Sequence, residues 1–247
     1  MEPDEGFYAR IGLLIPPPNA VMEVEFNRWV PTEVAVHATR MYRSTSDVTV
    51  ESLLEMARHV DEAARLLAMT LPDVIMFGCT SGSLIMGVGW DREIIQSIEG
   101  ATGIRALTTS TAVVAALNAV GARKVAVATP YNEEVNLRER RFLEGHGLQV
   151  LGICGMGIVK SEEIARVPPS QVHRFARGCD HPDADALFVS CTNLRTMEVI
   201  DRLEDELGKP VVTSNQASLW MCLRVVGAGR LLARGGRLLK ELSDSGS

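Results

Sequence analysis

Short apolar runs alternate with amphipathic stretches along almost the whole chain. Most of these runs are nearly continuous in apolar residues, which is typical of parallel strands that are covered on both faces. We therefore predict eight strands, at residues 10–16, 34–40, 73–79, 105–110, 124–130, 148–154, 186–191 and 210–215.

The stretches between these strands have helical periodicity. Several carry start signals, and glycines such as Gly100, Gly121 and Gly208 stand where left-handed helix ends are expected. The predicted helices span residues 51–70, 90–99, 111–120, 133–145, 161–178, 195–207 and 216–226. Strands that alternate with helices predict an α/β fold, with mostly parallel sheets flanked by helices.

Three segments of the first half recur, in the same order, in the second half. VIMFGCTSG (74–82) resembles ALFVSCTNL (186–194), and IPPPNAVMEVE from Ile15 resembles ATPYNEEVNLRE from Ala128. A weaker echo relates residues 107–122 to 211–228. A repeat of this kind predicts two similar units. We expect two pseudo-symmetric lobes with the active site in the cleft between them. The first is residues 1–105, completed by the C-terminal segment 215–247, and the second is residues 106–214.

The repeat gives Cys79 and Cys191 equivalent places. Each ends an apolar strand, and open parallel sheets bind ligands beyond the carboxyl ends of their strands. Cysteine is often an inert buried residue, but the repeat and the polar residues beside these two favour chemistry. Two thiols facing one carbon can abstract and return a proton, or add to the carbon and leave again.

Small polar residues follow each of these cysteines, namely Thr80 and Ser81 in the first motif and Thr192 and Asn193 in the second. We expect free backbone N–H groups there to bind a small anion and to depress the pKa of the adjacent thiol. For Cys154, Cys179 and Cys222 we expect plain packing.

Composition narrows the function classes. The formal net charge is −6 and no Lys/Arg stripe is present, which argues against a nucleic-acid partner. No apolar run reaches the length of a membrane span, and the acidic start lacks the features of a secretory signal. An odd, scattered set of five cysteines favours free thiols in the cytoplasm. The segment CDHPDAD (179–185) is interpreted as a polar turn, so we predict no metal site.

Taken together, these motifs resemble the aspartate/glutamate racemase superfamily, and within it the maleate cis–trans isomerase and arylmalonate decarboxylase branch. GLLIPPPNAVMEVEF, GCTSG, VAVATPYNEEVN and VSCTN carry the resemblance, which covers residues 9 to 230. It implies a cofactor-independent enzyme that acts on a small dicarboxylate and assembles as a dimer or tetramer.

The resemblance also implies roles for individual residues. In the maleate isomerases the first cysteine adds to the alkene, the central bond rotates, and the second cysteine helps to expel the first. Carried over, Cys79 is the nucleophile and Cys191 the acid and base. The substrate carboxylates would be held by Asn19, Tyr131 and Asn132, and by backbone N–H groups of Thr80, Ser81, Thr192 and Asn193.

Two departures from the family pattern leave the reaction open. Pro17-Pro18-Asn19-Ala20-Val21 replaces a hydroxyl-rich isomerase loop and looks more like the decarboxylase branch. That branch, however, has glycine at the place of Cys79. Maleate-to-fumarate isomerisation is thus the leading hypothesis. The alternatives are a racemase of an α-substituted acid, an arylmalonate-type decarboxylase and a non-catalytic metabolite-binding protein. Loops 40–50 and 154–170 are expected to shape the pocket and to select the substrate.

Overall fold

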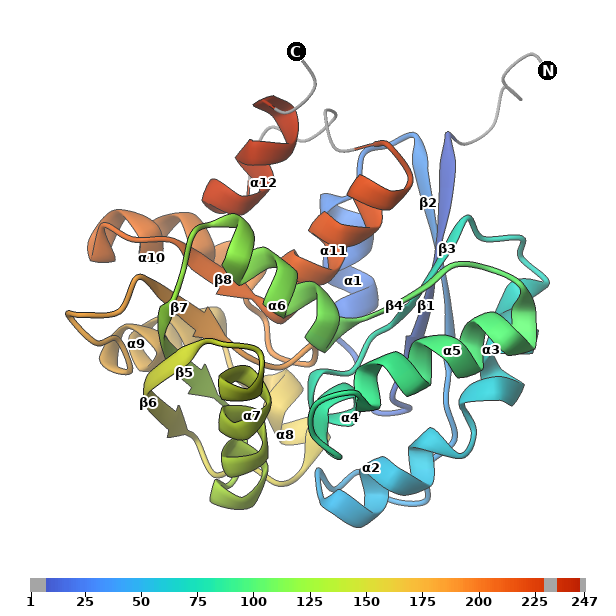
Figure 1. Ribbon diagram of the computed structural model, residues 1–247, viewed down its shortest axis with the longest axis horizontal. Helices are drawn as coiled ribbons and strands as arrows, with labels where there is room; N and C mark the ends of the chain where they lie inside the picture. Colours follow the sequence, from blue (N-terminus) through green and yellow to red (C-terminus); the bar gives the residue numbers. More distant parts are fainter. Residues whose placement is uncertain (1–7, 229–234, 245–247) are drawn as a thin grey trace.

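Two four-stranded parallel sheets form the framework of the molecule (Figure 1). The computed structural model describes residues 8–228 and 235–244. The first sheet contains β1 (Ala9–Ile15), β2 (Val34–Arg40), β3 (Val74–Phe77) and β4 (Ala106–Thr108). The second contains β5 (Lys124–Thr129), β6 (Gln149–Gly155), β7 (Ala186–Val189) and β8 (Val211–Thr213). Each of the eight predicted strand segments overlaps one of these strands.

The two sheets have the same strand order. It is β2-β1-β3-β4 in the first sheet and β6-β5-β7-β8 in the second, and all pairings are parallel. Strands that correspond in the repeat therefore occupy corresponding positions. The predicted α/β fold with two pseudo-symmetric sheets is confirmed.

The helices cover the sheets. Those of the first half are α1 (Met22–Trp29), α2 (Val50–Ala57), α3 (Val60–Ala68), α4 (Thr80–Leu84), α5 (Trp90–Thr102) and α6 (Thr109–Ala119). Later in the chain come α7 (Glu133–Gly145), α8 (Ser161–Arg166), α9 (Pro169–Gly178), the 3-10 turn η1 (Met197–Val199), α10 (Ile200–Leu207), α11 (Ser214–Val225) and α12 (Gly236–Asp244).

Two predicted helices are each divided in two. The helix expected over 51–70 turns at Arg58 and His59, and the helix expected over 161–178 is interrupted before Pro169. Proline has no N–H to continue a helix but fits its first turn, which is where Pro169 begins α9. Pro168, just ahead of it, has an extended backbone.

Helices α6 and α11 pack against each other at the centre of the molecule (Figure 1). They are equivalent in the repeat and begin in the same way. Thr108 accepts a hydrogen bond from the Thr111 N–H, and Thr213 accepts one from the Gln216 N–H. Such side-chain caps satisfy N–H groups that the helix itself leaves free. This central pair joins the two halves.

The predicted division into lobes assigned residue 106 and those after it to the second lobe. Strand β4, however, pairs with β3 in the first sheet, Met76 lying opposite Leu107. The first sheet is therefore complete only after Thr108. Where the lobes divide along the helices, and whether 215–247 completes the first lobe, stay predictions; residues 229–234 and 245–247 lie outside the described residues. Within the described ranges, no helix has the length and apolar character needed to cross a bilayer.

Candidate active site

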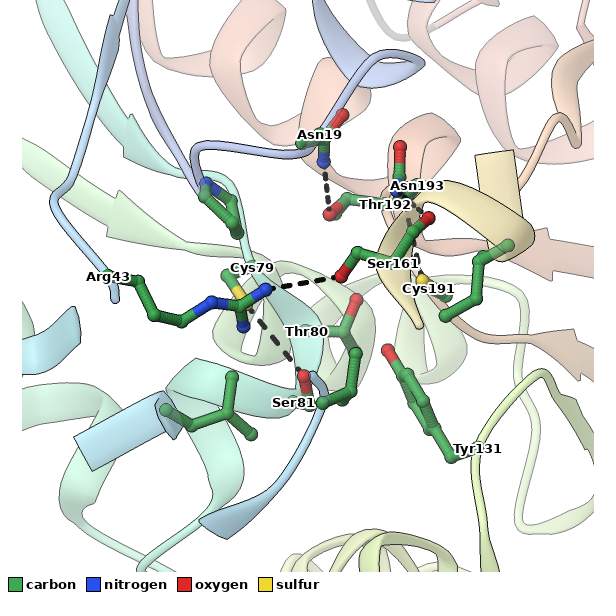
Figure 2. Close-up of a pocket in the computed structure, with 14 residues that line it drawn as sticks. Asn19, Arg43, Cys79, Thr80, Ser81, Tyr131, Ser161, Cys191, Thr192 and Asn193 are labelled. Atoms are coloured by element: carbon green, nitrogen blue, oxygen red, sulfur yellow. Dashed lines mark hydrogen bonds between the residues drawn. The ribbon is translucent and has the colours of Figure 1, made fainter. Parts of the chain in front are cut away.

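One small cavity lies between the two halves, at the carboxyl ends of both sheets, with Cys79 and Cys191 in its wall (Figure 2). Its volume is about 20 Å³, which is room for about one water molecule. Its lining residues are Pro16, Asn19, Arg43, Val48, Leu53, Cys79, Thr80, Ser81, Tyr131, Ser161, Ile164, Cys191, Thr192 and Asn193. The cavity is thus narrow, and both thiols line it.

Cys79 stands at the start of α4. Its sulfur accepts a hydrogen bond from the Gly82 N–H at 3.3 Å and lies 3.8 Å from the Ser81 hydroxyl oxygen. A Cβ at position 82 would come within 3.0 Å of this sulfur, so glycine lets the helix turn approach the thiol. Burial raises the pKa of Cys79, while the Gly82 N–H, the Arg43 guanidinium and Ser81 oppose that rise.

Cys191 has an unusual backbone. Its φ is 100°, a region that L residues with a side chain seldom adopt, whereas Cys79 has an extended φ of −146°. The Cys191 N–H donates to the Ser214 hydroxyl at 3.0 Å, and its sulfur accepts from the Asn193 N–H at 3.4 Å. Strained conformations of this kind persist where the surrounding structure holds them. The two thiols are equivalent in the repeat but not in local conformation.

Burial raises the pKa of Cys191 to about 12. The nearby Tyr131 hydroxyl and the Asn193 N–H lower this pKa, while the Cys79 and Glu139 charges raise it. The predicted backbone N–H groups do lower the pKa of each thiol, but the net pKa of both thiols is raised. Those N–H groups are present, but desolvation outweighs them because both sulfurs are buried.

Asn19, Thr192 and Asn193 join the two halves. Asn19 Nδ2 donates to Thr192 Oγ1 at 3.0 Å, and Thr192 Oγ1 donates to the Gly78 carbonyl at 3.0 Å. Asn193 accepts from the Ala20 N–H at 2.9 Å and donates to the Ser161 carbonyl at 2.8 Å. Much of the hydrogen-bonding capacity of these side chains is therefore used within the protein.

Asn132 is the predicted site residue that does not line this cavity. Its side chain accepts from the Val135 N–H and caps α7, just as Asn19 accepts from the Met22 N–H at the start of α1. Asn132 borders a separate, open hollow, and Tyr131 lies between the two spaces. The two asparagines that the repeat pairs both accept a hydrogen bond at the start of a helix, but only Asn19 lines the cavity with the thiols.

Arg43 was not predicted. Its side chain is buried, and its Nη2 donates to the Ser46 carbonyl at 3.1 Å and to Ser161 Oγ at 3.2 Å. Its Nε has no hydrogen-bond partner among the described residues. Burial lowers the pKa of Arg43, and the Cys79 charge is the first of several that oppose this. Its position in the sequence could have indicated a role, because it comes three residues after a strand whose carboxyl end faces the site.

Two segments, which we call the strap, meet across the cavity. Residues 46–48 of the first half run antiparallel to residues 159–161 of the second. The Val48 N–H donates to the Val159 carbonyl at 2.8 Å, and Lys160 forms an ion pair with Asp47. Val48 and Ser161 also line the cavity. The loops expected to shape the pocket thus include the two segments that cover it.

Among residues 8–228 and 235–244, no three His, Cys, Asp or Glu side chains come together as a metal site would require. The segment 179–185 forms a turn ahead of β7, and Asp180 there pairs with Lys209 at 3.2 Å.

A family model described as arylmalonate decarboxylase matches residues 11–239. The chain belongs to the arylmalonate decarboxylase family. It is 32% identical over 234 residues to an arylmalonate decarboxylase of Bordetella bronchiseptica, covering 94% of this chain and 96% of that protein. It is 29% identical over 240 residues to a maleate isomerase of Nocardia farcinica, covering 90% and 95%. The resemblance to both enzymes is confirmed.

A solved structure of the same family also superposes on nearly the whole chain. It is a cysteine-to-serine variant of the Nocardia farcinica maleate cis–trans isomerase with a covalently bound succinylcysteine intermediate. The TM-score is 0.89 at 25% identity, and the match covers 94% of this chain and 98% of that one. Relatives in the family are thus enzymes of two kinds, a decarboxylase and an isomerase.

Proposed function

We propose that this protein is a cofactor-independent isomerase that converts a small cis-unsaturated dicarboxylate of the maleate type into its trans isomer. The observation that carries the proposal is the placement of two thiols in one small cavity beside a buried guanidinium. Isomerisation through an adduct uses two thiols, whereas a decarboxylation needs one proton donor.

Arg43 supports a carboxylate substrate. A guanidinium presents its N–H groups as a planar fork that matches a carboxylate, and Arg43 Nε has no partner among the described residues. The cation also favours the thiolate of Cys79, which is the form that attacks carbon. Substrate binding and activation of the nucleophile are thereby assigned to one side of the cavity.

Each bond, proton and electron pair in the proposed reaction is accounted for. The Cys79 thiolate forms a C–S bond to one alkene carbon while Cys191 gives its thiol proton to the neighbouring carbon. The covalent intermediate formed in this step is a thioether of succinate, and its central bond is single and can rotate. The Cys191 thiolate then removes a proton from the same carbon, the C–S bond breaks, and its electron pair returns to Cys79. No oxidant, reductant or water is consumed.

Cavity size supports the smaller of the two substrate classes in the family. The free space is close to that of one water molecule, so even a four-carbon diacid requires some opening of the strap. An aryl ring would require considerably more.

Decarboxylation is the second candidate. The observations in its favour are the 32% identity to a decarboxylase and the single thiol, Cys191, that such a reaction would need. The two proposals differ in their dependence on Cys79, because only the adduct route requires it.

The deciding experiment follows a panel of dicarboxylates, including maleate and phenylmalonate, by proton NMR in heavy water. We expect maleate to give fumarate, and Cys79→Ser and Cys191→Ser each to abolish this, whereas Cys154→Ser, at an exposed thiol, retains activity. Carbon dioxide release that survives Cys79→Gly but not Cys191→Gly would establish the decarboxylase instead. Binding without turnover of any compound would refute both.

A further inference from the structure

A buried hydroxyl group behind the cavity is bonded to both cysteine motifs. Ser214 is the first residue of α11, and its side chain is fully buried. Its Oγ accepts a hydrogen bond from Thr80 Oγ1 at 2.8 Å and another from the Cys191 N–H at 3.0 Å. Thr80 directly follows Cys79, and both donors belong to residues that line the cavity (Figure 2). One oxygen atom of α11 thus joins the two motifs.

A second connection between the motifs runs in the opposite sense. Thr192, which follows Cys191, donates from Oγ1 to the carbonyl of Gly78, which precedes Cys79, at 3.0 Å. The residue after each cysteine is therefore bonded to the segment that carries the other cysteine. In one case the bond is direct, and in the other it passes through the hydroxyl of α11. Together the two connections fix the relative placement of the segments that hold the thiols.

The hydrogen bond to Ser214 also holds a residue with a strained backbone. Cys191 has a φ of 100°, which persists only where its surroundings hold it. Two further hydrogen bonds of Cys191 stay within its own turn, since its sulfur accepts from the Asn193 N–H and its carbonyl from the Leu194 N–H at 3.3 Å. The bond to Ser214 instead ties this turn to a long helix at the centre of the molecule. It thereby fixes the direction in which the thiol leaves the backbone.

Cys79 is held by contacts that do not involve this hydroxyl. Its sulfur accepts from the Gly82 N–H, and its carbonyl accepts from the Ser83 hydroxyl at 2.8 Å, so α4 itself holds the first thiol. Loss of the Ser214 oxygen leaves both contacts in place but removes one from the Cys191 backbone. The consequence should therefore fall mainly on the steps that use Cys191.

The equivalent residue of the other half makes different contacts. Thr109, at the start of α6, corresponds to Ser214 in the repeat and is also buried. Its hydroxyl donates to the Phe77 carbonyl at 3.2 Å and accepts from Ser218 Oγ at 3.1 Å. A threonine is thus accommodated at the equivalent place, whereas the link to both motifs is made by Ser214.

We propose that Ser214 is a positioning residue whose hydroxyl oxygen sets the placement of Cys191 relative to the segment that carries Cys79. It acts through its two donors and exchanges no proton with the substrate. Its importance for turnover rests on the proposed function, because only a reaction that uses both thiols on one substrate depends on their alignment. The placement itself exists in the free protein and can be measured without any substrate.

The kinetic test uses Ser214→Ala, which removes the oxygen and leaves two buried donors without an acceptor. We expect the kcat for maleate to fall about 10- to 100-fold, the order of effect that a small misplacement of a reacting group produces. KM should change little, because Arg43 and the backbone N–H groups assigned to the carboxylates remain. During turnover, part of the peptide that contains Cys79 should carry the mass of one maleic acid, because proton removal by Cys191 has become slow.

Two variants of the same helix provide the controls. Ser214→Thr keeps the oxygen atom and should retain a kcat close to that of the wild type. Ser218→Ala removes another buried hydroxyl of α11, one that bonds to Thr109, and should leave kcat unchanged even if urea denaturation shows an equal loss of stability. If Ser214→Ala folds poorly, Ser214→Cys fills the space with a weak acceptor and should show the same fall in kcat.

Hydrogen exchange tests the placement without a substrate. The Cys191 amide should exchange about tenfold faster in Ser214→Ala than in the wild type, as expected for the loss of a neutral hydrogen bond, and Ser214→Thr should restore the slow exchange. Residue-resolved mass spectrometry measures this rate. The Gly82 amide, which donates to the Cys79 sulfur, is the internal reference and should exchange at the same rate in all three proteins.

Three results would overturn the proposal. The first is an unchanged Cys191 exchange rate in a folded Ser214→Ala. The second is an equal fall in kcat in Ser218→Ala, which would indicate a general effect of α11 packing. The third is a raised KM with an unchanged kcat, which would indicate a role in binding. If the wild type converts no dicarboxylate, the proposed function fails, while the exchange rates still decide whether Ser214 places Cys191.

Discussion

Arg43 donates a hydrogen bond from Nη2 to Ser161 Oγ at 3.2 Å, so a guanidinium of the first half is held by a hydroxyl of the second. The Ser161 carbonyl in turn accepts from Asn193, two residues after Cys191. The cation that favours the Cys79 thiolate is therefore linked through Ser161 to the segment that carries the other motif. Hydrogen bonds thus connect Arg43 through Ser161 and Asn193 to the Cys191 sulfur.

Replacement of Arg43 should weaken substrate binding and shift the pH profile. We expect Arg43→Gln to raise the KM for a dicarboxylate by about 10- to 100-fold, since a hydrogen bond to a charged group contributes ~1.5–3 kcal/mol. Loss of the cation also raises the Cys79 pKa, so activity should begin at a higher pH than in the wild type. Steady-state kinetics across pH tests both effects. Arg40→Gln, at an exposed arginine paired with Glu23, is the matched control, and an equal KM change there would contradict the assignment.

Cys191→Ser should trap the adduct. With maleate we expect the peptide that contains Cys79 to gain the mass of one maleic acid. The serine hydroxyl or water can still supply the proton that completes the adduct, but neither is basic enough to remove it again and release Cys79. Intact and peptide mass spectrometry would detect it. Cys79→Ser should gain nothing under the same conditions. An adduct on Cys191 in that variant would reverse the assigned roles.

Glu139 should make stability depend on pH. Its folded-state pKa of about 7 lies above its ordinary value of 4.5, so between these values the folded protein holds a proton that the unfolded chain releases. The free energy of unfolding contributed by this group is therefore greatest below pH 4.5, falls as the pH rises to about 7, and is constant above that. Glu139→Gln should be more stable than the wild type at pH 8, by on the order of 1–3 kcal/mol, and nearly equal at low pH.

Urea denaturation at pH 5 and pH 8 measures this difference. Glu25 also has a pKa raised to about 7 by burial, so part of the wild-type pH dependence should persist in the variant. Glu133→Gln should show the wild-type curve. A Glu139→Gln variant that is less stable than the wild type at pH 8 would indicate that the carboxylate makes contacts that favour the fold.

The strap should control access to both thiols. Lys160→Glu places two negative charges opposite each other at the Asp47–Lys160 pair, and we expect Cys79 and Cys191 to be alkylated several-fold faster. The increase is limited because exposed ion pairs contribute only about 0–1 kcal/mol. The exchanged pair, Asp47→Lys with Lys160→Asp, should restore slow alkylation. Unchanged rates in Lys160→Glu would mean that the backbone hydrogen bonds alone hold the strap.

Much of the framework could be predicted from the sequence because it depends on local pattern. The apolar runs predict all eight strands of the described residues, and the Cys-Thr echo predicts that two strand ends of different sheets converge. Helix α4 was missed because Thr80, Ser81 and Gly82 have little helical preference. It is supported instead by contacts of the motif itself, in which the Ser83 hydroxyl donates to the Cys79 carbonyl at 2.8 Å.

The electrostatics of the site could not be predicted in the same way. Arg43 and Glu139 are charged residues, and such residues are ordinarily exposed, so nothing in their local sequence indicates that both are buried. Whether a thiol beside backbone N–H groups is acidic depends on desolvation, which is a property of the closed cavity. The sequence supplies the reacting atoms; their protonation depends on packing between distant segments.

The two sheets have the same strand order, so any difference between the surroundings of the two thiols must come from the sequences of the two halves. If two identical half-length chains assembled with the same symmetry, each thiol would have the same neighbours, and any mutation would act on both at once. In one continuous chain the halves are encoded separately, so a cation can be placed near Cys79 while Cys191 alone has a backbone with positive φ. Fusion of the two halves thus provides what proton transfer in one direction requires, two chemically identical groups that are no longer interchangeable.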